Sequence, residues 1–333
     1  MSDALPWTPL HAQFHRVLRS RKLLPPASRI LVAVSGGQDS LCLIRLLLDL
    51  RSKWDWTIAI AHCDHRWRPD SGANADHIER LANNWNTPFY RLTAGPIPAS
   101  EAAARRWRYR AIGEVALSHN YHYVVTGHTA SDRAETLLYN LIRGGGADGL
   151  AALTWSRPLF PENPDSEVML VRPMLEIARS ETGEFCKNRH LEIWEDSTNA
   201  DLRHARNRIR NELLPYLQTH FNPNAEQNLA RTAELLRADV DYLETEAEKL
   251  YDRAICRDRD RPGVNRQPLK KAPLALQRRV MRRLLREVLP GASNFEQIEK
   301  LTALISAPNR SQTDPFPGGA IARVEGDWIT INN

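Results

Sequence analysis

The segment SGGQDS, residues 35–40, combines two adjacent glycines with two serines and an acid. It follows the apolar run RILVAV and precedes a stretch with leucines at helical spacing. Such a turn lets backbone N–H groups approach an anion at a helix N-terminus. An acid at position 39 then favours a divalent cation between carboxylate and phosphate. The candidate phosphate contacts in this loop are Ser35, Gly36, Gly37, Gln38, Asp39 and Ser40.

Two further polar segments follow predicted strands and could complete such a site. HCDHRWR begins at His62, where a second strand ends, and GHTASDRAET begins at Gly127 after another strand. The carboxyl ends of parallel strands form the edge at which open α/β sheets bind ligands. Asp132 and Glu135 lie three residues apart, on one face of a predicted helix. Two carboxylates there could serve Mg²⁺ and an incoming ammonium group.

Each segment also has a plainer structural explanation. A lone SGG is often only a strand-to-helix turn, and this one is neither a GxxxxGK[ST] loop nor a GxGxxG fingerprint. Acids in a first helical turn are favoured by the helix dipole, so Asp132 and Glu135 could simply stabilise a helix start. His65 and His128 could accept a proton from an ammonium group or could be structural. These explanations leave unexplained why the segments occur together, and the combination favours function.

Three basic clusters indicate contacts with a polyanion. The first surrounds Trp107 and Tyr109, a mixture suited to phosphate pairing and base stacking. Its members are Arg105, Arg106, Arg108 and Arg110. The second comprises Arg203, His204, Arg206, Arg208 and Arg210, and the third comprises Arg278, Arg279, Arg282, Arg283 and Arg286. One such run is more often a solvated helix face, but three beside a nucleotide site favour RNA.

The elements that must position these residues alternate between strand and helix. Strands are predicted at Arg29 to Val34, Thr57 to Cys63, Phe89 to Leu92, Tyr121 to Thr126 and Val168 to Val171. Helices are predicted at Leu41 to Leu50, Asn74 to Trp85, Ala102 to Ser118 and Asp132 to Leu141. This alternation predicts an α/β fold with a doubly wound, mostly parallel sheet and right-handed crossovers.

The composition changes near residue 213. A long amphipathic helix is predicted at Ala225 to Leu250, then helices at Leu274 to Leu289 and Asn294 to Ile305, and finally a small hairpin that turns at Glu325 to Asp327. We therefore predict a catalytic domain over residues 1–213 and a smaller, helical accessory domain over residues 214–333 that ends in the hairpin and, because it carries the third arginine cluster, binds RNA.

Composition excludes several classes of protein. The chain has 333 residues, of which 42% are hydrophobic, and a formal net charge of +5, so it is globular and tolerates a polyanionic partner. Its four cysteines are far apart in sequence, without a CxxC pair, which indicates a reduced cytoplasm rather than a disulfide framework. We predict neither a signal peptide nor a membrane span, because no apolar run approaches roughly 20 residues.

The motifs SGGQDS, HCDHRWR, GHTASDRAET and LIRGGGADGL, in this order, resemble those of the tRNA(Ile)-lysidine synthetases, a family of PP-loop ATP pyrophosphatases with the adenine nucleotide alpha hydrolase-like fold. EDSTNADLRHARNRIRNELLP resembles a later block of the same family, matched by Asp196, Asn199, Arg206, Asn207 and Arg210. The sequence departs from the family at Arg133, where Gln is usual, and at Trp67, where Leu is common.

The resemblance implies an ATP-dependent ligase. Such an enzyme adenylates C2 of the wobble cytidine in the CAU-anticodon tRNA(Ile) and then joins free L-lysine to that carbon. It releases AMP and pyrophosphate and changes codon reading from AUG to AUA. The implied partners are ATP, Mg²⁺, L-lysine, this tRNA and, as an open possibility, a second copy of the chain.

The resemblance also assigns roles to residues. The implied catalytic residues are Asp39, Asp132 and Glu135, and the implied metal ligands are Asp39 and Asp132. His62 and Gly127 join the six loop residues in binding ATP. The substrate contacts are Asp132, Glu135, Arg143, Arg105, Arg106, Arg206 and Arg210.

Three alternatives remain open at the level of the sequence. A tRNA thiolation enzyme would need paired cysteines, and a small-molecule amidotransferase-type ligase would have no use for the arginine and aromatic clusters. A non-catalytic RNA-binding protein on the same fold would not need Asp39, Asp132 and Glu135 together.

Overall fold

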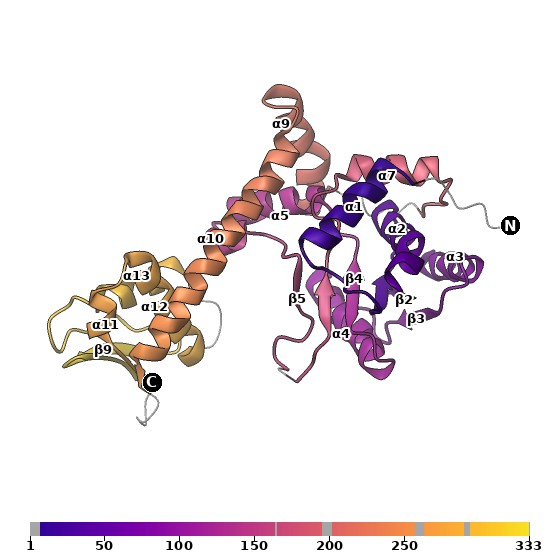
Figure 1. Cartoon of the computed structure of the whole chain (residues 1–333). Helices are drawn as coiled ribbons and strands as arrows, with labels where there is room; N and C mark the ends of the chain where they lie inside the picture. The colour runs from indigo at the N-terminus through magenta and orange to yellow at the C-terminus, as the bar shows by residue number, and fades with distance from the viewer. Residues whose placement is uncertain (1–6, 164, 195–201, 257–262, 290–293, 333) are drawn as a thin grey trace. The chain divides into compact units, whose positions relative to one another are not determined.

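The first compact unit, residues 1–236, is built on a six-stranded sheet in the order β3-β2-β1-β4-β6-β5 (Figure 1). The computed structural model describes residues 7–163, 165–194, 202–256, 263–289 and 294–332. The strands are β1 (Arg29–Ala33), β2 (Thr57–Asp64), β3 (Phe89–Thr93), β4 (Tyr123–Thr126), β5 (Ser156–Pro158) and β6 (Met169–Val171). Neighbouring strands are parallel except β5, which runs antiparallel to β6 at the edge.

Helices cover both faces of this sheet. They are α1 (Pro9–Ser20), α2 (Gln38–Trp54), α3 (Ser71–Asn84), α4 (Glu101–Ser118), α5 (Ala130–Ile142), α6 (Ala147–Leu150) and α7 (Arg179–Asn188). Ile30 and Val32 of β1 belong to the core that includes α1, α2 and α7, whereas Leu31 belongs to a second core with Ile112 of α4. Alternation along a strand sends successive side chains to opposite faces. The predicted doubly wound α/β fold is therefore confirmed.

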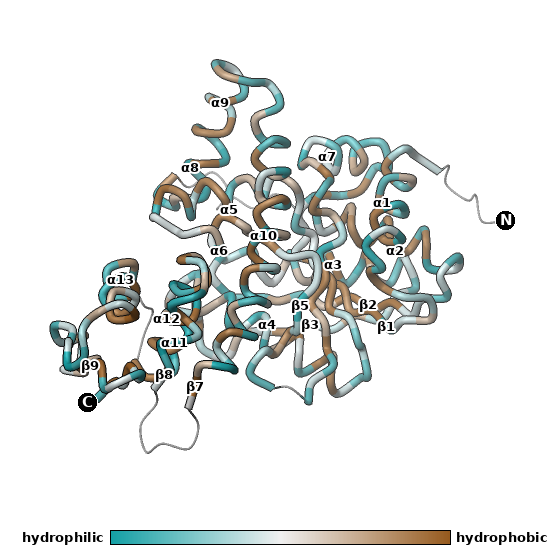
Figure 2. Tube along the Cα trace, turned by 60° about the vertical axis from the view of Figure 1, so that its left-hand side comes forward, coloured by the Kyte–Doolittle hydropathy of each residue, from teal (hydrophilic) through white to brown (hydrophobic). Residues whose placement is uncertain are grey.

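The leucine-rich sequence of α2 explains why this helix lies against the sheet. Nine of its residues are buried, and both the central strands and this helix carry much of the hydrophobic colouring in Figure 2. Asp55 ends the helix in the left-handed conformation, at φ 54°, and its N–H bonds to the carbonyl of Arg51. Burial of α2 fixes the position of its N-terminus, where the SGGQDS loop lies.

A helical run after residue 202 packs on α5. It consists of α8 (Ala205–Arg208), the π-helical turn η2 (Ile209–Leu213) and α9 (Leu214–His220). Ile209 and Leu214 share a small core with Ala134 and Leu138 of α5 and with Ala233 of the next helix. That next helix is α10 (Ala225–Ala254), which confirms the long helix predicted from the sequence.

The second compact unit, residues 237–333, holds a four-stranded antiparallel sheet in the order β7-β8-β10-β9. Its elements after α10 are β7 (Ile255–Cys256), β8 (Gly263–Asn265), α11 (Arg266–Lys270), α12 (Leu274–Val288), α13 (Phe295–Ala303), β9 (Ile321–Glu325) and β10 (Trp328–Asn332). The predicted hairpin is confirmed as β9 and β10. It is part of a larger sheet, because the short strands β7 and β8 extend it.

Ion pairs within this unit neutralise much of the third arginine cluster. Arg278 Nε lies 2.7 Å from Glu299 Oε1, and Arg282 Nη2 lies 2.5 Å from Glu244 Oε1. Since acids from α10 and α13 already occupy these guanidinium groups, the cluster serves first to hold the helices of this unit together.

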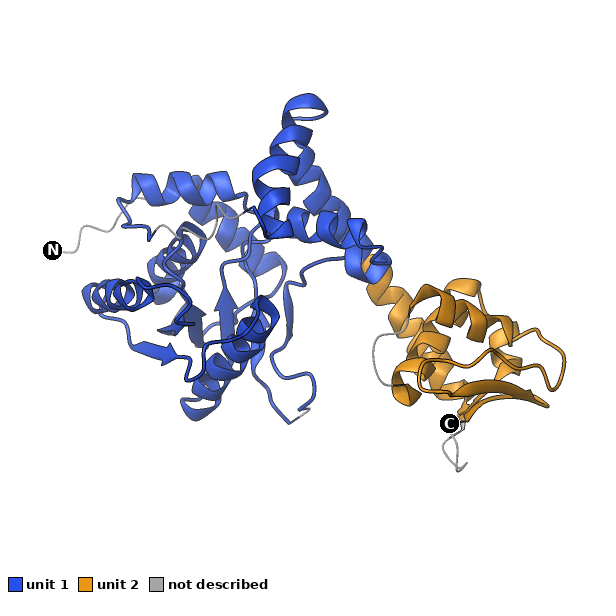
Figure 3. Cartoon of the chain, turned by 180° about the vertical axis from the view of Figure 1, so that it is seen from behind, with its two compact units in different colours: residues 1–236 blue, residues 237–333 orange. Residues whose placement is uncertain are grey.

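The division of the chain by compactness falls at residues 236 and 237, inside α10 (Figure 3). The domain boundary predicted from composition, between residues 213 and 214, lies earlier, within the helical run on α5. It stays a prediction, since a compact unit and an independently folding domain are different properties.

Candidate active site

The SGGQDS loop connects β1 to α2 and folds around the hydroxyl of Ser40. That Oγ accepts a hydrogen bond from Ser35 N (3.2 Å) and donates one to Gly37 O (2.8 Å). Gly37 stands at the N-cap of α2 and provides no side-chain cap. The first N–H groups of α2 therefore remain available to an anion, with the positive end of the helix dipole behind them.

Two glycines allow the backbone to pack closely here. Gly36 has φ +96°, and a Cβ at this position would lie 2.5 Å from Asn74 Oδ1. Gly127, directly after β4, lies so close to α2 that its Cβ would stand 2.9 Å from Asp39 O. Both positions need glycine, the first for its conformation and the second for the close approach of β4 to the loop.

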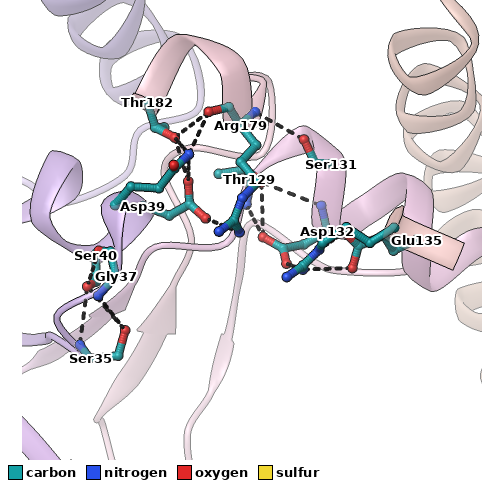
Figure 4. Close-up of polar contacts among 12 residues, drawn as sticks. Ser35, Gly37, Asp39, Ser40, Thr129, Ser131, Asp132, Glu135, Arg179 and Thr182 are labelled. Atoms are coloured by element: carbon teal, nitrogen blue, oxygen red, sulfur yellow. Dashed lines mark hydrogen bonds and ion pairs between the residues drawn. The ribbon is translucent and has the colours of Figure 1, made fainter. Parts of the chain in front are cut away.

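Asp39 projects from the first turn of α2 and is held by two residues of α7 (Figure 4). Arg179 Nη1 donates to its Oδ2 at 2.8 Å, and Thr182 Oγ1 donates to its Oδ1 at 2.5 Å. Burial raises the pKa of Asp39, an effect that the charge of Arg179 opposes and the charge of Asp132 reinforces. The carboxylates of Asp39 and Asp132 therefore lie within electrostatic reach of each other.

Asp132 and Glu135 of α5 share one arginine. Arg210 Nε donates to Glu135 Oε1 at 2.5 Å, and its Nη2 lies 2.9 Å from Glu135 Oε2 and 3.3 Å from Asp132 Oδ1. Asp132 Oδ2 also accepts from Thr129 N at 2.8 Å, in a capping box at the start of α5. Burial raises the pKa of Glu135, and Arg210 opposes that rise. Asp132 therefore caps the helix, as its structural explanation expected, and also belongs to the polar cluster.

Arg179 and Thr182 were not among the predicted site residues. Arg179 links Asp39 to the start of α5, because its guanidinium pairs with Asp39 while its backbone N–H bonds to Ser131 Oγ at 3.0 Å (Figure 4). No local pattern singles these residues out, since they lie 140 and 143 positions from Asp39 in the chain. The polar sequence of α7 also gave no strong helical signal.

Burial lowers the pKa of all three histidines near the sheet edge. His62 is buried below the loop, with Nδ1 2.8 Å from Val34 O, and burial lowers its pKa. Burial also lowers the pKa of His65 to about 4 and that of His128 to about 3, with nearby arginines acting in the same direction. A base with so low a pKa is a poor acceptor for the proton of an ammonium group.

The predicted arginine contacts fall into two places. Arg105 lies over the ring of Tyr109, 5.4 Å from its centroid, and its charge reaches His128, whereas Arg106 is exposed on the same helix. Arg143 and Arg206 both lie over Tyr139, at 5.1 and 5.6 Å. Of the later block, Asp196 and Asn199 lie outside the described residues.

Arg133, where the sequence departs from the family pattern, points into the protein core. It is 2% exposed, pairs with Glu234 at 2.8 Å and donates to Leu153 O at 3.0 Å. Glu234 also accepts from Trp155 Nε1 at 3.0 Å and pairs with Arg21 at 2.6 Å. The Arg133 side chain therefore joins α5 to its neighbours and does not belong to the polar cluster of Asp39, Asp132 and Glu135.

Comparisons with known proteins place this geometry in a family. Residues 8–217 match the model of the PP-loop domain, and residues 265–328 match that of the TilS substrate binding domain. A tRNA(Ile)-lysidine synthase of Nostoc sp. (strain PCC 7120) is 62% identical, over 98% of both chains. The chain belongs to the tRNA(Ile)-lysidine synthase family.

Other relatives agree with this assignment to the lysidine synthases. The enzyme of the same name from Synechocystis sp. (strain PCC 6803) is 50% identical over 97% of both chains. The U34-tRNA thiolase NcsA from Methanococcus maripaludis shares the fold, with a TM-score of 0.57 at 14% identity, over 69% of this chain and 80% of that one.

Membership of the lysidine synthase family confirms the predicted fold, the use of ATP and the predicted activity, lysidine formation on tRNA(Ile). It decides against the thiolation and amidotransferase alternatives. Cys42, Cys63 and Cys186 are free thiols, and the first and last are fully buried. Among the described residues, none of the helices combines the length and apolar composition needed to cross a membrane.

Proposed function

We propose that this chain uses Asp39, Asp132 and Glu135 to couple two steps at one sheet edge. In the first, the C2 oxygen of the wobble cytidine of CAU-anticodon tRNA(Ile) attacks the α phosphorus of ATP, and pyrophosphate leaves. In the second, the ε-amino nitrogen of free L-lysine attacks C2, and the C2–oxygen bond to AMP breaks. The observation that carries the proposal is the link from Asp39 through Arg179 to the start of α5.

The loop residues 35–40 bind the triphosphate in this proposal. The uncapped N-terminus of α2 and the hydroxyl of Ser35 offer hydrogen-bond donors to phosphate oxygens, while Ser40 keeps the loop in shape through its bond to Gly37 O. Gly127 keeps β4 close beneath the loop. His62 supports the loop through its bond to Val34 O, so its contribution to ATP binding is indirect.

The donor set at Asp39 and Asp132 fits Mg²⁺. This ion takes one or two carboxylates and completes its coordination with water and substrate phosphates, so a protein site of three or more ligands is unnecessary. Within the described residues, no three His, Cys, Asp or Glu side chains form such a site. When bound there, Mg²⁺ would neutralise charge on the phosphates. Arg179 and Arg210 hold the same two carboxylates in the structure described here.

Glu135 is the proposed proton acceptor for lysine. An ammonium group must become a neutral amine before it attacks carbon. Burial raises the pKa of Glu135, which makes its carboxylate a stronger base for accepting that proton. Asp132 provides a second negative charge for the ammonium group. Arg210 connects both acids and is placed to orient them.

The RNA contacts proposed are Arg105, Arg106, Arg143 and Arg206. Arg105, Arg143 and Arg206 each lie over a tyrosine ring, an arrangement that supports phosphate pairing beside base stacking. Free thiols fit a reducing compartment, so we also propose a cytoplasmic location. A homodimer stays a prediction, which light scattering of the purified chain would test.

Incorporation of labelled lysine into tRNA transcripts tests the function directly. The full chain is incubated with ATP, Mg²⁺ and either the isoleucine or the methionine CAU-anticodon transcript, and AMP and pyrophosphate are measured in parallel. The proposal expects lysine in the isoleucine transcript alone, with equal amounts of AMP. Release of AMP without lysine incorporation would contradict the second step, and turnover without added tRNA would contradict the first.

A further inference from the structure

A cavity of about 720 Å³ opens beside the end of α5, away from the SGGQDS loop. One wall is formed by Tyr139 and Ile142 of α5 with Arg143 at its C-cap, and the other by the run α8, η2 and α9. Its volume falls within the range usual for small-molecule sites. The exposed fractions of Ile142 (68%) and Tyr216 (54%) show that apolar surface remains open at its rim.

The lining combines aromatic rings, cations and one acid. Tyr139 and Tyr216 contribute rings, Arg143 and Arg208 contribute positive charge, and Ile209 with Leu213 forms apolar surface. Arg143 also donates to the hydroxyl of Tyr139. Rings and guanidinium planes are the groups on which proteins stack unpaired bases of single-stranded RNA.

Glu212 adds a hydrogen-bond acceptor to this lining. Among the described residues, its carboxylate has no hydrogen-bond or ion-pair partner. A carboxylate in such a position accepts from exocyclic amino groups and ring N–H groups of bases.

A π-helical turn explains why these side chains meet. Within η2, the N–H of Leu214 bonds to the carbonyl of Ile209, five residues back. Arg208, Glu212 and Tyr216 follow one another at intervals of four and line the same cavity. Arg210, from the same turn, reaches the other way to Glu135. Single π-helical turns inside α-helices are frequent at functional sites.

Residues on both walls of the cavity lie close in the chain to the catalytic carboxylates or to Arg210, which binds them. Tyr139 follows Glu135 by four residues on α5, which is just over one helical turn, or about 6 Å along the axis. Arg210 lies between Arg208 and Glu212 on the opposite wall. A nucleotide next to the one that reacts at Asp132 and Glu135 would therefore come within reach of Tyr139 and Tyr216.

We propose that this cavity binds a nucleobase of the tRNA anticodon loop, one adjacent to the wobble cytidine, stacked on Tyr216 and Tyr139. This inference rests on the proposed function, because it needs the wobble cytidine at the carboxylate site. The base is held by stacking and by hydrogen bonds to Glu212, while Arg143 and Arg208 pair with its phosphates. Binding of this neighbour orients the wobble cytidine for attack.

Steady-state kinetics of the full-length enzyme test the stacking role. Tyr216→Ala is expected to raise the KM for isoleucine tRNA transcript about tenfold, equivalent to about 1.4 kcal/mol, whereas Tyr216→Phe keeps the wild-type value. The KM values for ATP and lysine are expected to change by less than about twofold. The matched control is Tyr242→Ala, which removes an exposed tyrosine (67%) from α10.

Transcripts with a single abasic nucleotide on either side of the wobble cytidine identify the base. One of these transcripts is expected to raise the KM of the wild-type enzyme about tenfold. The same transcript is expected to raise the KM of Tyr216→Ala no further, because the abasic nucleotide and the substitution remove the same contact. Independent effects at both positions would overturn the proposal. So would a tRNA KM unchanged in Tyr216→Ala, or a rise in the lysine KM alone, which would indicate an amino-acid site.

Failure of this inference can be told from failure of the proposed function. Wild-type enzyme that incorporates no lysine into the unmodified transcript contradicts the function itself. Wild-type enzyme that incorporates lysine, together with a Tyr216→Ala variant that matches it, contradicts only the base-binding cavity.

Discussion

Arg210 donates two hydrogen bonds to Glu135, from Nε to Oε1 at 2.5 Å and from Nη2 to Oε2 at 2.9 Å. A guanidinium fork fits a carboxylate in this two-point geometry, which an ammonium group cannot reproduce. The same Nη2 lies 3.3 Å from Asp132, so one side chain sets the relative positions of both acids on α5. Under the proposed function, lysine is a cationic substrate that would compete with Arg210 for these carboxylates.

Replacing Arg210 separates its charge from its geometry. Arg210→Lys keeps the charge but loses the fork, and we expect kcat/KM for lysine to fall about 100-fold.

Arg210→Met also removes the charge that opposes the raised pKa of Glu135, so this pKa rises further. Glu135 is then protonated at higher pH, and the acid limb of the pH–rate profile moves to higher pH. Profiles from about pH 5 to pH 9 check this, with the exposed Arg231→Met as control. An unmoved acid limb in Arg210→Met would exclude Glu135 as the titrating base.

Asp39 is expected to be essential to the first step. Asp39→Asn keeps the shape of the side chain but removes the charge proposed for Mg²⁺, and we expect AMP formation to fall at least about 100-fold. Thr182→Val, which removes one hydrogen bond to Asp39, is expected to have a smaller effect. The measurement is pyrophosphate release over a series of Mg²⁺ concentrations. Full activity of Asp39→Asn, with an unchanged Mg²⁺ requirement, would rule out the metal assignment.

Gly127→Ala should damage ATP binding. The added methyl group would lie 2.9 Å from Asp39 O, so β4 and the start of α2 must move apart. We expect the Kd for ATP to rise about tenfold, an effect of order 1.4 kcal/mol. Gly95→Ala is the control, because a Cβ there meets nothing within 4 Å. Equal ATP affinities in the two variants would show that the loop tolerates the displacement.

Arg133 is expected to govern stability rather than catalysis. Arg133→Met leaves the remaining partners of Glu234 in place but breaks a buried ion pair, which costs about 3 kcal/mol in the free energy of unfolding. Urea unfolding measures this cost, and the KM values for ATP and tRNA provide the comparison. A variant with wild-type stability and a raised tRNA KM would instead assign Arg133 to substrate binding.

Glu234, the partner of Arg133, makes the stability of the fold depend on pH. Although burial acts to raise it, the pKa of Glu234 is lowered by its bond to Trp155 and by the charges of Arg133 and Arg21. A carboxyl group whose pKa is lower in the folded than in the unfolded protein stabilises the fold at pH values above its unfolded pKa, about 4.3. This stabilisation is lost as the pH falls through the pKa of the folded state. The stability difference between wild type and Glu234→Gln is therefore expected to shrink below about pH 4. A difference that grows in acid would contradict this.

The elements around the loop could be predicted because their patterns are local. The β-branched run at β1 and the leucines of α2 carry their own periodicity, and glycines between them mark the turn. The acids of α5 were also predictable, since Asp132 and Glu135 follow a strand end at helical spacing. These features depend on neighbours within about one or two helical turns.

The residues that complete the site could not be predicted in the same way. Arg179 and Thr182 contact Asp39 from 140 and 143 positions away in the chain, and no period in the sequence reports such a contact. The short strand β5 contains a proline, and β7 has only two residues, so neither shows an alternating pattern. Asn74, which supports Ser35 through a 3.0 Å hydrogen bond, looks in sequence like any polar helix residue.

The carboxylate of Glu234 contacts three side chains, those of Arg21, Arg133 and Trp155. The fitness effect of a substitution at any one of these positions must therefore depend on which residues occupy the others. Because Arg133 is buried against Glu234, we expect an arginine at position 133 to be tolerated during divergence only where position 234 already has an acid. We expect family members with glutamine at position 133 to have lost this acid as well, so that these sites change together along lineages.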